Sequence, residues 1–243
     1  MPRTTTPTRR STRPRRRRRR DHSPAPTEVG EAVAATREQS FLLAKPEKRL
    51  LRAMARRLPA WVVPNDLTAV GVLAAIGIAA AYALSGDGNG WLWAASALLV
   101  VHWLGDSLDG TLARVRGIGR PRYGYYLDHL TDAIATAAIG IGLGLSPYML
   151  LAVGLAIVIA YLILSINTYL ETQAFGVFTL GYGRLGPTEA RLMLIAVNTA
   201  LALGASTFGI LDVLGIGLVA VMIAALVGRA ARNLKRLSEL ELA

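Results

Sequence analysis

Long runs of apolar residues, separated by short polar connections, make up most of the chain after residue 61. Residues 67–84, 133–170 and 192–211 contain no charged side chain. An uncharged apolar run of about 18 residues or more is typical of a transmembrane helix, and glycine is more frequent in such helices than in soluble ones. The pattern predicts an all-α integral membrane protein with six spans, at residues 66–85, 91–116, 124–145, 148–172, 187–204 and 212–231.

Basic residues gather in alternate connections between these spans. Of the 27 Lys and Arg residues, 17 precede Trp61, and the others lie in the second connection, beside the fourth connection and after the sixth span. Cytoplasmic loops of membrane proteins carry an excess of Lys and Arg. We therefore expect both termini to lie in the cytoplasm, with the protein in the cell (inner or plasma) membrane.

The first 60 residues differ from the rest. Residues 1–36 include the run "RPRRRRRR" and contribute much of the net charge of +11, so we expect a disordered basic tail. Beside a membrane domain, anionic lipid headgroups are a nearer partner for this tail than nucleic acid. The alternative is a solvated tail that only fixes topology.

Residues 37–60 mix apolar and basic side chains, which predicts an amphipathic juxtamembrane helix on the membrane surface, with Pro46 as the place of any break. An ordinary soluble helix is the alternative. We assign residues 61–232 to the six-helix domain and residues 233–243 to a cytoplasmic C-terminal tail. The absence of cysteine excludes disulfides, thiol nucleophiles and cysteine-ligated zinc.

Four aspartates interrupt the second and third predicted spans: Asp106, Asp109, Asp128 and Asp132. Within each span the two are three or four residues apart, so each pair shares one helix face. Two adjacent antiparallel helices could point all four carboxylates into one pocket in the cytoplasmic half of the membrane. Unpaired anions there would repel one another and lose their hydration. Oxygen-only ligands favour Mg²⁺, Mn²⁺ or Ca²⁺, and two such ions can promote a phosphoryl displacement.

Two other interpretations of the aspartates stay open at this point. They could form ion pairs with the arginines of the second connection at the membrane interface. They could also mark the pathway of a proton or ion transporter, although a transporter more often places its charges near the midplane. A non-enzymatic anchor that presents the basic tail belongs to the same class of alternatives.

The arrangement Asp106-x-x-Asp109-Gly110-x-x-Ala113-Arg114, followed after nine residues by Gly124-x-x-x-Asp128-x-x-x-Asp132, resembles the signature of CDP-alcohol phosphotransferases. The resemblance covers about residues 60–232 and implies six membrane helices. It also implies an enzyme of phospholipid synthesis that transfers a phosphoalcohol from a CDP-alcohol to a hydroxyl acceptor and releases CMP.

The resemblance implies roles for individual residues. The four aspartates would hold two divalent cations, Mg²⁺ or Mn²⁺, and Asp132 would be the general base. The stretch "VPNDLTAVG" resembles the Pro-Asn-x-x-Thr start of the first helix in this family. A homodimer is also implied, and glycine pairs such as Gly140 and Gly144 would allow close helix packing. Residues expected to contact nucleotide or substrate are Asn65, Thr68, Gly110, Ala113, Arg114, Gly124 and Glu171; Arg114 could instead be a topological anchor.

Two further stretches favour the choline/ethanolamine phosphotransferase-like branch, which passes a CDP-choline or CDP-ethanolamine headgroup to a diacylglycerol-like lipid. They are "LDHLTD", with His129, and "ETQAFGVFTLGYGRLGPTEARL", with Glu171 and Glu189. His129 and Glu189 are additional catalytic candidates, although His129 could pack between helices and Glu189 could cap one. Leu127 and the lack of paired glutamates depart from that branch. The alternative is transfer of a phosphatidyl group from CDP-diacylglycerol to a small polar alcohol.

Overall fold

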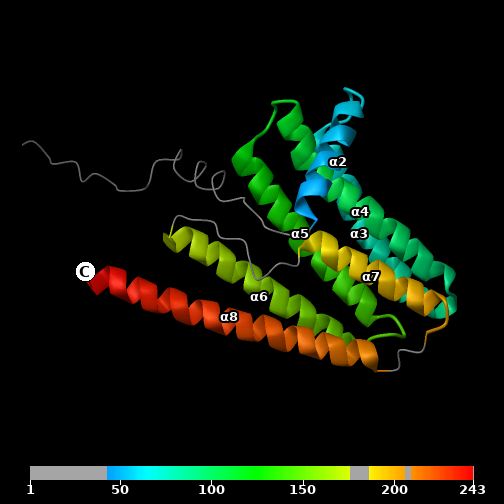
Figure 1. The fold of residues 1–243 in the computed structure, drawn as a ribbon. Helices are drawn as coiled ribbons and strands as arrows, with labels where there is room; N and C mark the ends of the chain where they lie inside the picture. Colours follow the sequence, from blue (N-terminus) through cyan, green and yellow to red (C-terminus); the bar gives the residue numbers. More distant parts are fainter. Residues whose placement is uncertain (1–42, 176–185, 206–208, 243) are drawn as a thin grey trace, which may run out of the picture.

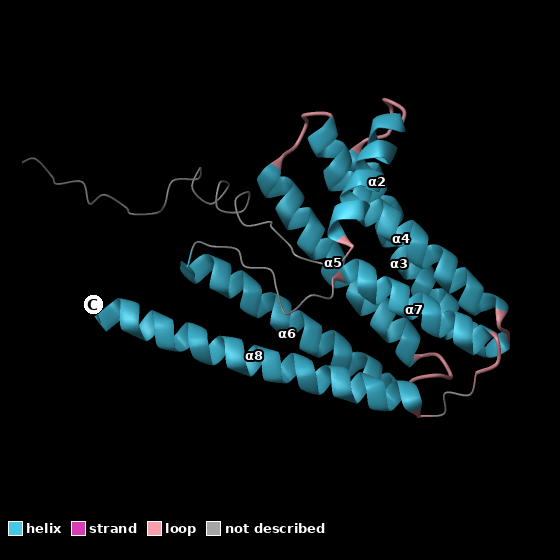
Figure 2. Cartoon of the chain, in the orientation of Figure 1, coloured by secondary structure: helices cyan, strands magenta, loops and turns pink. Residues whose placement is uncertain are grey.

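The structure, a computed structural model, describes residues 43–175, 186–205 and 209–242. Within these ranges it contains helices and no strand (Figures 1 and 2), which confirms the all-α prediction. Each predicted span overlaps one long helix. The elements are α2 (Ala44–Arg57), α3 (Pro64–Ala83), the short 3-10 helix η1 (Ser85–Asp87), α4 (Gly90–Val115), α5 (Pro121–Gly144), α6 (Leu151–Phe175), α7 (Pro187–Ala202) and α8 (Ile210–Leu242).

Three of the described helices, α3, α6 and α8, are long and apolar enough to cross a membrane. The aspartates lie in α4 and α5, and α7 has only 16 residues, fewer than the roughly 20 that a spanning helix usually needs. The structure thus supports a membrane protein. The count of six spans and the cytoplasmic position of the termini stay predictions.

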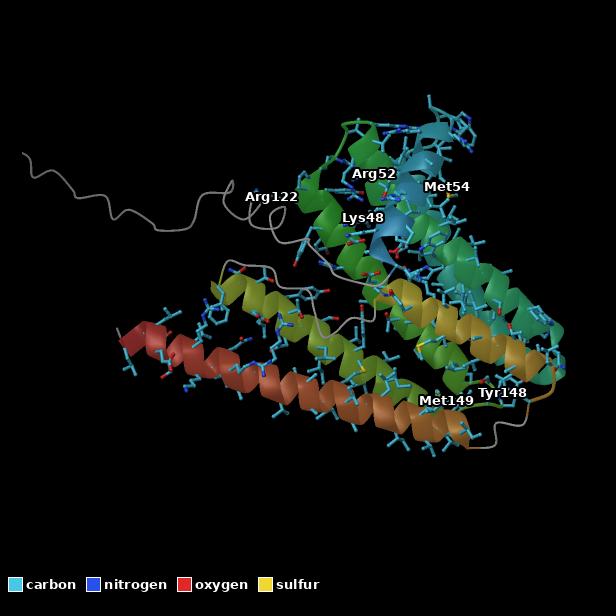
Figure 3. All side chains as sticks on the ribbon, viewed as in Figure 1. Lys48, Arg52, Met54, Arg122, Tyr148 and Met149 are labelled. Carbon is cyan, nitrogen blue, oxygen red and sulfur yellow. The ribbon has the colours of Figure 1, made fainter. Side chains whose placement is uncertain are left out.

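Helix α3 lies at the centre of the helix packing. Helix α3 contacts both α4 and α5; α7 packs on α4, α6 packs on α5, and α8 packs on α6 (Figure 1). The largest apolar core joins α3 and α4 to the ends of α6, α7 and α8, around the buried residues Tyr82, Ile78, Leu92 and Leu99. Figure 3 shows Tyr148 and Met149 in the turn between α5 and α6, at the end of the bundle away from α2.

Small residues bring these helices close together. A Cβ atom at Gly105 would lie 2.6 Å from both the backbone nitrogen of Gly71 and the carbonyl oxygen of Leu67, so α3 and α4 meet backbone to backbone there. Gly140 and Gly144 of α5 lie against Gly154 and neighbouring residues of α6. The two α5 glycines therefore serve packing within the chain, and the predicted homodimer draws no support from them.

Helix α2 packs on α4 along part of its apolar face. Leu51 and Ala55 are buried in a second core with Leu108 and Leu112 of α4. The helix begins two residues before Pro46, so this proline lies in the first turn, where its missing N–H costs nothing, and α2 is unbroken. Six basic side chains of α2 remain exposed: Lys45, Lys48, Arg49, Arg52, Arg56 and Arg57.

Helix α8 runs further than the predicted span. It continues to Leu242 through the segment expected to be a C-terminal tail, because residues 232–242 are mostly good helix formers such as Leu, Lys, Arg and Glu. The predicted basic tail at residues 1–36 lies outside the described residues, as does the start of the predicted juxtamembrane segment.

Candidate functional site

Asp106 and Asp109 of α4 each have a well-placed partner on another helix. The guanidinium of Arg191, in α7, donates to Asp106 Oδ2 at 2.6 Å, and both side chains are mostly buried. The Thr68 hydroxyl, in α3, donates to Asp109 Oδ2 at 2.6 Å, while Asp109 Oδ1 accepts the backbone N–H of Gly110. Because Thr68 is itself buried, Asp109 is held in one orientation.

The other two aspartates belong to a compact group on α5. One side-chain ligand atom from each of Asp128, His129 and Asp132 lies within 4.8 Å of the other two. The His129 ring also packs between aromatic rings, with its centroid 4.3 Å from that of Tyr125 and 5.2 Å from that of Tyr169. The sequence predicted carboxylate ligands alone, and the structure adds an imidazole beside them.

The four carboxylates lie within electrostatic range of one another, and we call them the aspartate cluster (Asp106, Asp109, Asp128 and Asp132). The charges of Asp106, Asp109 and Asp128 all act on Asp132, and so does the charge of Arg191. Asp109 is likewise subject to the charges of Asp106 and Asp128. The folded chain therefore brings together the residues that the sequence placed in one pocket.

The donor set of this cluster fits divalent cations. The four carboxylates lie close together, and the ion pair from Arg191 to Asp106 offsets part of their negative charge; carboxylate oxygens are the ligands that Mg²⁺ and Mn²⁺ prefer. Asp128 and Asp132, with the neighbouring His129, are close enough together to share one ion. Asp109, oriented by Thr68, would face the same ions.

The remaining nucleotide candidates lie on α3, α4 and α5. The Asn65 amide donates to the Tyr123 hydroxyl at 2.9 Å, which joins the beginnings of α3 and α5. Arg114 is exposed, and its guanidinium lies over Gly110, where a Cβ would meet Nη1 at 3.3 Å. Ala113 is partly exposed next to Arg114, and a Cβ at Gly124 would meet open space.

Glu171 and Glu189 have structural partners. Arg229 of α8 donates to Glu171 Oε2 at 2.6 Å, and side-chain exposures of 9% and 13% make this a buried ion pair. One Glu189 oxygen accepts the N–H of Gly186 at 2.9 Å and the other accepts the N–H of Leu43 at 3.2 Å. Glu189 therefore caps α7, the alternative that its position after Pro187 allowed.

Sequence reasoning did not assign Arg191 to the site. It counted Arg191 only as a marker of topology, although a cation one turn inside a short apolar helix is unusual enough to indicate a function. His102, one turn before Asp106 in α4, is buried, with its Nδ1 3.0 Å from the Gly71 carbonyl. Its other nitrogen lies 3.4 Å from the Arg191 guanidinium, so His102 also borders the site.

Solved structures with this fold include two of Mycobacterium tuberculosis phosphatidylinositol phosphate synthase, PgsA1. The one with CDP-DAG bound is 24% identical, has a TM-score of 0.61, and the match covers 76% of this chain and 94% of that one. The one in complex with manganese and citrate is 22% identical, has a TM-score of 0.59, and the match covers 77% of this chain and 88% of that one. No curated protein sequence matches the chain.

The family comparison is decisive for the class of protein. Residues 61–228, more than half of the chain, match the family model described as CDP-alcohol phosphatidyltransferase. This range contains the whole aspartate cluster, Thr68 and Arg191, and it begins after α2. The chain is thus a phosphotransferase of phospholipid synthesis and belongs to the CDP-alcohol phosphatidyltransferase family.

Proposed function

We propose that this protein transfers a phosphatidyl group from CDP-diacylglycerol to a small polar alcohol and releases CMP. The observation that carries the proposal is the aspartate cluster, in which Asp132 is under the charges of the three other carboxylates. Such a concentration of negative charge within apolar helices favours the binding of divalent cations. These cations would in turn bind the pyrophosphate of the donor. When bound, two divalent cations would neutralise charge developing on the leaving CMP.

The protein's own residues would bind the cations, accept a proton and stabilise charge. Asp109, fixed by Thr68, and the Asp128–His129–Asp132 group would hold the cations. Asp132, which shares a face of α5 with Asp128, would accept the proton of the attacking hydroxyl. Arg191 would stabilise the negative charge at Asp106.

The acceptor side of the reaction distinguishes this proposal from the choline/ethanolamine reading that the sequence favoured. Glu171 is engaged by Arg229, and both Glu189 oxygens accept backbone N–H groups, so neither is an open carboxylate in the structure. Residues 176–185 of the second stretch lie outside the described residues. The PgsA1 structures, one of them with CDP-DAG bound, favour CDP-diacylglycerol as the donor.

We place the site at the cytoplasmic face of the cell membrane. Figure 3 shows Lys48 and Arg52 of α2 and Arg122 of α5 at the same end of the bundle, away from the turn that holds Tyr148. The exposed basic residues of α2 lie at this end as well. An excess of Lys and Arg on one side supports a cytoplasmic assignment.

A panel of donors and acceptors in proteoliposomes tests the substrate. CDP-diacylglycerol would be offered with glycerol phosphates, inositol and an inositol phosphate, the last because PgsA1 is a phosphatidylinositol phosphate synthase. CDP-choline and CDP-ethanolamine would each be offered with diacylglycerol. We expect CMP only from CDP-diacylglycerol together with one of the polar acceptors. Turnover of CDP-choline or CDP-ethanolamine, with none of CDP-diacylglycerol, would refute the proposal and restore the choline/ethanolamine reading.

A further inference from the structure

Among the described helices, α4 is the main neighbour of α7, the helix that carries Arg191. It packs on α4 and lies along the outside of the bundle (Figure 1). Far from the site, the buried Asn198 secures it: the Asn198 side chain accepts from the Tyr82 hydroxyl at 3.0 Å and donates to Ser96 at 3.2 Å. The first turn of α7 needs a separate anchor, since Arg191 lies near that end.

Glu47 of α2 supplies such an anchor. Its Oε1 accepts the indole N–H of Trp103, in α4, at 2.8 Å and the hydroxyl of Thr188, in α7, at 3.0 Å. A carboxylate oxygen can accept both bonds at once. A single side chain thus ties three helices together, and the bond from the Leu43 N–H to Glu189 Oε1 joins α2 and α7 a second time.

The two partners of Glu47 lie next to the ion pair of the site. Trp103 is three residues before Asp106 on α4, and Thr188 is three residues before Arg191 on α7, so each shares a helix face with one member of the pair. A shift of α7 against α4 at Glu47 would therefore change the distance between Arg191 and Asp106, which is 2.6 Å. Misplacing a group by about 1 Å can cost an enzyme about 100-fold in rate.

Helix α2 is also fixed at its other end. The Arg116 guanidinium, at the end of α4, donates to the carbonyls of Leu58 at 3.1 Å and Pro59 at 2.7 Å. It also donates to the Val62 carbonyl at 2.5 Å. With Leu51 and Ala55 buried between these two ends in a core shared with α4, α2 is held against α4 along its length.

We propose that Glu47, which lies outside the residues matched by the family model, is a positioning residue that sets Arg191 against Asp106 by joining α2, α4 and α7. The effect on catalysis rests on the proposed function, whereas the joining of the helices does not. Three substitutions separate the contributions. Glu47→Gln keeps an oxygen that can accept both hydrogen bonds, Glu47→Asp keeps the charge but shortens the reach, and Glu47→Ala removes both.

The first experiment measures, without substrate, how firmly Glu47 holds α2 and α7 together. The chain has no cysteine, so spin labels can be attached to cysteines introduced at two exposed positions, Arg52 on α2 and Met193 on α7. We expect the interspin distance distribution to shift or broaden in Glu47→Ala and Glu47→Asp. It should match the unsubstituted, labelled chain in Glu47→Gln and in Lys48→Ala, the exposed neighbour. An unchanged distribution in Glu47→Ala would overturn the proposal.

The second experiment is a double-mutant cycle on turnover. We expect Glu47→Ala to lower kcat about 10-fold, within the range found for residues that orient a metal site, and Glu47→Gln to restore it. If Glu47 acts through Arg191, Glu47→Ala combined with Arg191→Gln should be no slower than Arg191→Gln alone. Independent, additive losses would overturn the positioning role. If the unsubstituted enzyme turns over no CDP-alcohol, the proposed function fails. The distance measurement still decides whether Glu47 joins the helices.

Discussion

The guanidinium of Arg191 lies 2.6 Å from Asp106 Oδ2 and joins two helices whose contacting residues are 85 positions apart in the chain. This ion pair places one cation within a cluster of four carboxylates. It has two consequences: Arg191 offsets part of the negative charge, and it occupies an oxygen that a divalent cation could use. The second consequence leads to a prediction with a definite sign.

Replacing Arg191 with Gln should tighten the binding of Mn²⁺, because the guanidinium competes with the ion for Asp106. We expect the dissociation constant to fall by about 10-fold, equivalent to about 1.4 kcal/mol, while turnover falls. Titration of free Mn²⁺ by electron paramagnetic resonance measures binding without substrate. Arg122→Gln removes the same charge from an exposed position and should leave affinity nearly unchanged. Weaker Mn²⁺ binding in Arg191→Gln would contradict the competition.

Replacing Thr68 with Val should impair the metal site while preserving side-chain shape. Without the hydroxyl, Asp109 Oδ2 loses the partner that fixes its direction. Losing such an orienting hydrogen bond typically lowers metal affinity or activity by about 10- to 100-fold. The dependence of CMP release on Mn²⁺ concentration would show this loss. Thr68→Ser keeps the hydroxyl and should resemble the unsubstituted enzyme; equal losses in both variants would attribute the effect to packing instead.

Replacing Gly105 with Ala should destabilise the protein. The new Cβ would lie 2.6 Å from backbone atoms of α3, so the two helices would have to separate beside Asp106. Overpacking of this kind costs about 1–3 kcal/mol. Thermal unfolding in detergent should show a lower Tm. Gly217→Ala in α8, where a Cβ meets nothing within 4 Å, is the matched control and should keep or slightly raise Tm. An identical Tm for the two variants would argue against the close contact.

The buried Glu171–Arg229 pair should behave as a structural link between α6 and α8. Removing one partner leaves a buried charge, which typically costs about 3–5 kcal/mol, so Glu171→Met or Arg229→Met should each lower Tm strongly. The double variant should recover much of the loss because neither charge remains. Additive losses, seen in the same detergent unfolding assay, would show that the two residues act separately.

The sequence was sufficient to predict the order of the long helices and the close grouping of the four aspartates. Hydropathy indicates where the long apolar helices lie, and spacing along a helix determines which aspartates share a face. Contacts between distant helices could not be predicted, because they depend on how α7 packs on α4 and α2. Arg191 was therefore interpreted only as a topological marker, and Glu47 as one residue of a surface helix. Helix α8 continues beyond the predicted span, because hydropathy detects a membrane span but not its continuation as a polar helix.

CMP release by the Asp109→Asn and Asp132→Asn variants tests most directly the claim that the aspartate cluster is the catalytic centre. The assay would use proteoliposomes with Mg²⁺ or Mn²⁺ and the donor and acceptor that the unsubstituted enzyme accepts. Asp87→Asn, at an exposed position at the end of η1 and far from the cluster, is the matched control. We predict that release is abolished in both cluster variants, persists in the control, and stops when the cations are chelated. Release that continues in both cluster variants would contradict the account.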